Sequence, residues 1–102
     1  MWWTTAGVIS DAWIPCGDGR SVLARGQTER NGYVFRWEAK VYPEGSTCGI
    51  NGGRVSKLWI AELPPGEVRY WQEAAYYDRG WCTLPSTQEA MDFVDELLGR
   101  FK

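Results

Sequence analysis

The sequence predicts an α+β domain in which an antiparallel β-sheet of about four or five strands is covered on one face by a single C-terminal helix. Residues 33–42 alternate strictly between apolar and mostly polar side chains, which is typical of a strand with one buried face. Residues 90–101 place apolar side chains three and four positions apart, the spacing of an amphipathic helix. Because the strands precede the helix, a two-layer arrangement is favoured over a parallel βαβ fold.

The N-terminal part predicts two further strands. Residues 2–9 are rich in β-forming side chains and are interpreted as the first strand. Residues 10–20 contain proline and glycine and predict a loop or hairpin, after which residues 21–28 form a short second strand. We interpret residues 10–28 as an insertion or an extended hairpin within one domain, residues 1–102.

The central part predicts two longer strands. Asn31-Gly32 is a strong signal for a two-residue hairpin, because both residues tolerate positive φ. It leads into the strand at 33–42, whose apolar face comprises Tyr33, Phe35, Trp37, Ala39 and Val41. A glycine-rich connection over 43–53 precedes a strand over 54–63. In that strand one face is predicted to carry Leu58 and Ile60, and the other Val55, Lys57, Trp59 and Ala61.

The last two elements are a strand and the helix. Pro64-Pro65-Gly66 predicts a turn, and residues 67–77 the returning strand. Ser86 with Glu89 three residues later is a capping box, which marks the start of the helix. Its apolar stripe is made of Ala90, Phe93, Val94, Leu97, Leu98 and Phe101. An isolated helix of this length is marginal in water, so the stripe is expected to dock on the sheet.

Composition excludes several classes of function. Apolar residues make up 44% and charged residues 24% of 102 residues, which indicates one globular domain. The net charge is −2, so the chain lacks a basic footprint and direct nucleic-acid binding is not expected. No apolar run is long enough to span a membrane, and no signal peptide opens the chain. Three cysteines without a secretion signal point to the cytoplasm.

Catalytic chemistry and metal binding are not expected. The chain has no histidine, and Cys16, Cys48 and Cys82 form no CxxC pair, so a zinc site would need an uncommon ligand set. Without histidine, a serine or cysteine nucleophile would need another activating group, and no constellation of that kind is recognisable. We therefore expect a protein that is not an enzyme and carries no cofactor.

Two short segments are candidates for binding. In the segment 48–54, successive glycines either form a turn between strands or present backbone N–H groups to an anion. In the segment 76–81, tyrosine and tryptophan rings stand beside an arginine, which suits a stacked nucleotide but also suits a locked strand end or a protein-binding hot spot. We expect the two segments to converge on one face of the sheet, with the binding residues Asn51, Arg54, Lys57, Tyr77, Asp78, Arg79 and Trp81.

The residues Lys40-Val41-Tyr42 through Gly49-Ile50-Asn51-Gly52-Gly53-Arg54-Val55-Ser56-Lys57-Leu58, followed by Tyr77-Asp78-Arg79-Gly80-Trp81, resemble a family of small domains common in bacteriophages and prophages. The resemblance covers roughly residues 33–101 and brings no established activity. It implies a context, because small phage accessory proteins without catalytic residues often occupy a host target, and others sequester a nucleotide signal.

Two hypotheses follow from the residues and the resemblance together. The first is a non-enzymatic phage-type accessory protein that binds and inhibits a host protein of a bacterial defence system, an anti-CRISPR being one form. The second is a small-ligand binder that captures an anionic nucleotide signal at the face formed by residues 49–54 and 76–81. An isolated edge strand would also permit a homodimer.

Overall fold

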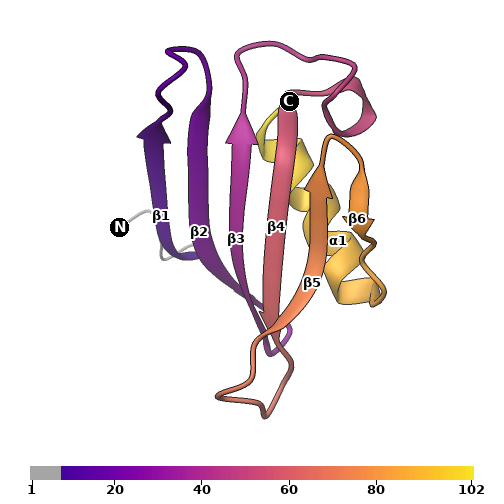
Figure 1. Cartoon of the computed structure of the whole chain (residues 1–102). Helices are drawn as coiled ribbons and strands as arrows, with labels where there is room; N and C mark the ends of the chain where they lie inside the picture. Colours follow the sequence, from indigo (N-terminus) through magenta and orange to yellow (C-terminus); the bar gives the residue numbers. More distant parts are fainter. Residues whose placement is uncertain (1–7) are drawn as a thin grey trace.

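In the described part of the chain, six antiparallel strands follow one another across a sheet in chain order, and one helix packs behind them (Figure 1). The computed structural model describes residues 8–102. The strands are β1 (Val8–Pro15), β2 (Val22–Arg30), β3 (Tyr33–Val41), β4 (Val55–Leu63), β5 (Gln72–Asp78) and β6 (Trp81–Thr83), and the helix is α1 (Gln88–Arg100). A short 3₁₀ turn, η2 (Ile50–Gly52), lies in the connection from β3 to β4. The predicted α+β class with one C-terminal helix is confirmed.

The number of strands was predicted too low. Residues 10–20 were predicted as a loop or hairpin; residues 10–15 belong to β1, which forms a hairpin with β2, and only the connection from Cys16 to Ser21 is a turn. Most of the predicted strand at 2–9 lies outside the described residues. The sixth strand, β6, is a three-residue strand beyond the turn at Arg79-Gly80, too short to give an alternating pattern. β5 begins at Gln72 and not at residue 67, because the turn after β4 extends into a longer loop.

The hairpin and the central strand were predicted correctly. Asn31 and Gly32 have φ values of 51° and 84°, as a two-residue hairpin requires. The whole apolar face of β3 lies toward α1, where Phe35 stacks on Phe93 of the helix with ring centroids 4.6 Å apart. Phe35 and Phe93 are both fully buried and form the centre of the core.

The side chain orientation at the start of β4 was predicted wrongly. Val55 was predicted to point away from Leu58, but both are buried in the same core cluster. The register between β3 and β4 shifts between Lys40 and Val41, so that β4 carries a bulge at Ser56. A bulge adds one residue to a strand and so reverses the alternation beyond it.

The helix also starts one residue later than predicted. Thr87, and not Ser86, is the N-cap, because its hydroxyl accepts a hydrogen bond of 3.1 Å from the backbone N–H of Ala90. The apolar stripe docks on the sheet as expected, and its last member, Phe101, contacts the ring of Trp13 in β1 edge-on. Within residues 8–102 there is no helix of sufficient length and apolarity to cross a membrane.

A buried carboxylate faces the helix from β4. Glu62 is 7% exposed, and its Oε1 has no hydrogen-bond partner. Burial raises the pKa of Glu62 above its ordinary value of 4.5. The folded state therefore holds a proton that the unfolded chain has already released, and stability falls as pH rises from about 4.5 through the raised pKa.

We expect Glu62→Gln to stabilise the domain at pH 7 by about 1 kcal/mol, since the amide removes a buried charge. The gain disappears at pH 4, where the carboxyl is protonated. Urea unfolding at both pH values measures this difference. Glu29→Gln, an exposed change on β2, is the matched control and leaves stability unchanged. An equal gain at both pH values would contradict the assignment.

Candidate functional site

A cavity of about 590 Å³ opens on the sheet face opposite α1, where β3 ends and β4 begins. Four cationic side chains line it, namely Arg20, Lys40, Lys57 and Arg79, against two acidic ones, Glu44 and Asp78. We call it the cationic cavity. Its volume lies within the range of small-molecule sites, about 300–1,000 Å³. Positive charge is thus gathered at one place on a chain whose net charge is −2.

The two lysines are brought together by the register of the sheet. Lys40 of β3 lies directly opposite Lys57 of β4, and Lys57 lies directly opposite Asp78 of β5. Like charges placed directly opposite on neighbouring strands destabilise a sheet. An anion bound between the ammonium groups would relieve this repulsion.

The turn between β1 and β2 adds Arg20. The carboxylate of Asp18 accepts hydrogen bonds from the backbone N–H groups of Arg20 and Ser21, both 2.9 Å, and from the Ser21 hydroxyl at 2.7 Å. These bonds hold the pKa of Asp18 far below its ordinary value. The turn is therefore fixed, with Asp18 on the flank of Lys40 at 3.9 Å.

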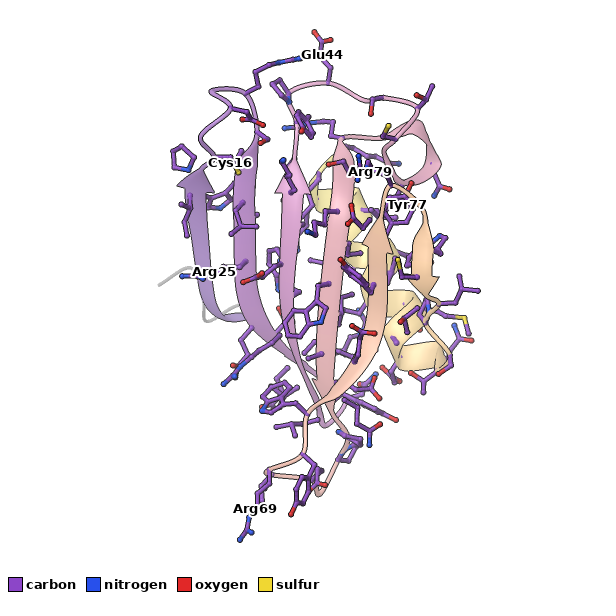
Figure 2. All side chains as sticks on the ribbon, in the orientation of Figure 1. Cys16, Arg25, Glu44, Arg69, Tyr77 and Arg79 are labelled. Carbon is purple, nitrogen blue, oxygen red and sulfur yellow. The ribbon has the colours of Figure 1, made fainter. Side chains whose placement is uncertain are left out.

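Arg79 enters from the turn between β5 and β6, at the upper end of β5 in Figure 2. Its φ is 59°, which is uncommon for arginine, and two backbone hydrogen bonds hold the turn. The N–H of Arg79 donates to the carbonyl of Ser56 at 3.2 Å, and that of Asp78 to the carbonyl of Gly80 at 2.9 Å. The Arg79 side chain is 74% exposed, so its guanidinium remains accessible at the rim.

The ion pairs within the cavity are long. Lys57 Nζ lies 4.0 Å from Asp78 and Arg79 Nε lies 3.6 Å from the same carboxylate. Charge-assisted hydrogen bonds are about 2.7–2.9 Å long, so these cations keep their donors for another acceptor. The pKa of Lys40 is raised above its ordinary value of 10.5 by the neighbouring Tyr42 side chain and, to a smaller extent, by Asp18.

The loop 43–53 forms the wall of the cavity and packs on itself. Gly49 is so close to the carbonyl oxygen of Gly53 that an added Cβ would overlap it. The N–H groups of Gly49, Gly52 and Gly53 all donate to carbonyls inside the loop. The segment is therefore a turn between strands, and these three N–H groups are not free to cradle an anion.

The seven predicted site residues divide between two faces of the sheet. Lys57, Asp78 and Arg79 line the cationic cavity. Asn51 and Arg54 line a second cavity of about 210 Å³ beside the end of α1. Arg54 Nε donates to the Tyr42 carbonyl at 2.8 Å, and its Nη1 donates to the Lys102 carbonyl at 3.3 Å. These two bonds tie the loop to the C-terminus.

Tyr77 and Trp81 lie on the helix side as well. Tyr77 is adjacent to Asp78 in one strand, and adjacent strand residues face opposite ways. Its hydroxyl donates to the Cys48 carbonyl at 2.9 Å, and its ring meets Trp81 edge-on at 5.2 Å. Both side chains therefore support the strand end and the loop.

Sequence reasoning did not assign Arg20, Lys40 and Tyr42 to the site. A signal was present for two of them, because Lys40 and Tyr42 share the polar face of the strand at 33–42. The position of Arg20 depends on the turn that Asp18 stabilises, and the sequence pattern did not predict this turn. In residues 8–102 there is no group of three or more histidine, cysteine or acidic side chains suited to a metal ion.

A family described as Domain of unknown function (DUF7678) matches residues 23–102. The chain belongs to the DUF7678 family. No curated protein and no solved structure matches it. The DUF7678 match begins after Arg20 and includes the other three cationic residues of the cavity.

Proposed function

We propose that this domain binds an anionic nucleotide in the cationic cavity and sequesters it without chemical change. The observation that carries the proposal is the direct opposition of Lys40 and Lys57 inside a concave site, with Arg20 and Arg79 at its edges. Phosphate oxygens are suitable acceptors for the N–H donors that these long ion pairs leave unused. In the phage context that the sequence resemblance implies, such a protein would inhibit a defence system by removing its signal nucleotide.

A panel of linear and cyclic nucleotides tests the proposal by thermal shift and calorimetry. A ligand at 100 times its Kd stabilises the folded state by about 2.7 kcal/mol, which raises Tm measurably. We expect Arg79→Ala to weaken binding about tenfold or more, since a hydrogen bond to a charged group contributes about 1.5–3 kcal/mol.

Arg69→Ala is the matched control, because Arg69 lies on the loop at the opposite end of the sheet from Arg79 (Figure 2). It leaves binding unchanged. The proposal fails if no nucleotide shifts Tm, or if the two arginine variants bind equally well.

Inhibition of a host protein would use a different surface. Three large apolar side chains in the segment 81–91 are exposed, namely Trp81 at 38%, Leu84 at 66% and Met91 at 40%. A tryptophan in an exposed apolar group is typical of a binding hot spot. Under this second proposal, Leu84→Ser abolishes capture of the host protein and Arg79→Ala leaves it intact. A pull-down from host lysate with mass spectrometry of proteins and small molecules separates the two.

A further inference from the structure

The open face of the sheet carries an aromatic pair next to the cationic cavity. Trp59 of β4 and Tyr76 of β5 lie directly opposite each other, and both are half-buried. They are two residues along their strands from Lys57 and Asp78, which form the floor of the cavity. Two strand residues span about 7 Å, so the rings and the cations belong to one continuous surface.

On the adjoining part of the open face, the charged and aromatic side chains already contact one another. Arg36 holds its guanidinium 4.4 Å from the ring centroid of Trp71 and also donates to Gln27 at 3.0 Å. Arg25 pairs with Glu38 at 3.8 Å on the other side. The Trp71 ring is therefore covered by a cation, whereas Trp59 and Tyr76 remain beside the cavity.

Asp78 lies directly opposite Lys57 and two residues along β5 from Tyr76, so it borders both the cations and the rings. Its carboxylate lies 3.5 Å from the Tyr76 hydroxyl and at least 3.6 Å from the two cations, so its acceptor positions are weakly used. A carboxylate repels phosphate. A carboxylate in an anion site therefore indicates that the ligand also carries a hydrogen-bond donor for it. Hydroxyl groups of a sugar are suitable donors to it.

From this arrangement we propose that the ligand is a ribonucleotide bound in one orientation. Its phosphates lie on Lys40 and Lys57, its ribose hydroxyls donate to Asp78, and its base stacks on Trp59 and Tyr76. The inference rests on the proposed nucleotide binding and adds the base and the sugar to what the cavity recognises. The distance from the cations to the rings is comparable to that between the 5′-phosphate and the base of one nucleotide.

Calorimetry with ATP, dATP and inorganic tripolyphosphate tests the base contact. A base stacked on an aromatic side chain contributes about 1–3 kcal/mol, which corresponds to a loss of about 5- to 150-fold in ATP affinity for Trp59→Leu. Tripolyphosphate affinity is unchanged in the same variant, since the cations remain. Trp71→Leu is the matched control and leaves ATP affinity unchanged, because Arg36 covers that ring.

The sugar contact has its own readout. The wild type binds ATP more tightly than dATP, and Asp78→Asn removes this preference while it strengthens tripolyphosphate binding, because a charge that repels phosphate is lost.

The outcomes separate the two proposals. If neither tripolyphosphate nor any nucleotide of the panel binds, the proposed function itself fails. If ATP and tripolyphosphate bind and Trp59→Leu has no effect on ATP affinity, only the ribonucleotide orientation is overturned. A single-stranded oligonucleotide that binds more than about tenfold tighter than ATP would likewise overturn the assignment of one nucleotide to this surface.

Discussion

Phe93→Ala is expected to reduce the free energy of unfolding by about 3–5 kcal/mol. Phe93 is fully buried, and its ring is nearly parallel to that of Phe35, at an interplanar angle of 8°. This contact joins α1 to the middle of the sheet. Removing the ring loses the transfer free energy of its carbons and leaves a cavity between the two layers. The free energy of unfolding of a domain of this size is about 5–15 kcal/mol in total, so much of its stability depends on this side chain.

Urea unfolding followed by far-UV circular dichroism measures the loss. Met91→Ala is a control on the same helix, because the Met91 side chain is 40% exposed, and we expect a change within about 0.5 kcal/mol. A loss below about 1 kcal/mol for Phe93→Ala would show that the helix docks by other contacts.

Gly49→Ala is expected to destabilise the domain by about 3 kcal/mol and to weaken nucleotide binding at the cationic cavity. The added methyl group would overlap the backbone carbonyl of Gly53, which no side-chain rotation relieves. The loop must open, and Ser46 and Cys48 in the cavity wall move with it. The same substitution is therefore expected to affect both the stability of the fold and the shape of the cavity.

Denaturant unfolding and nucleotide calorimetry on one preparation give both effects. Gly17→Ala, in the turn between β1 and β2, places its methyl group in open space and is expected to change neither quantity. Full nucleotide affinity in Gly49→Ala would show that the loop does not shape the cavity.

The sequence was sufficient to predict the elements whose apolar residues follow a strong periodicity. The alternation in β3 and the stripe in α1 identified two packed faces, because burial on one side leaves a regular pattern in each. The bulge at Ser56 left no such trace, so the side of Val55 was assigned wrongly. A bulge depends on the pairing partner, and the pairing is absent from a single strand's pattern.

The site was predictable only in part, for a similar reason. Neighbours in sequence, such as Tyr77 and Asp78, were expected to act together, although a strand sends them to opposite faces. Residues distant in sequence, such as Lys40 and Lys57, act together because of the register. Arg20 is brought in by the Asp18 turn, a local geometry that composition does not reveal.

The position of β1 at the margin of the sheet bears on where the charge of the cationic cavity comes from. Within residues 8–102, β1 pairs with β2 alone, and the DUF7678 match begins at residue 23, after β1 and its turn. Replacing β1 and its turn would leave the pairing from β2 to β6 intact. Because this turn delivers Arg20, one of the four cationic side chains of the cavity could be exchanged without altering the part of the chain that the family match covers.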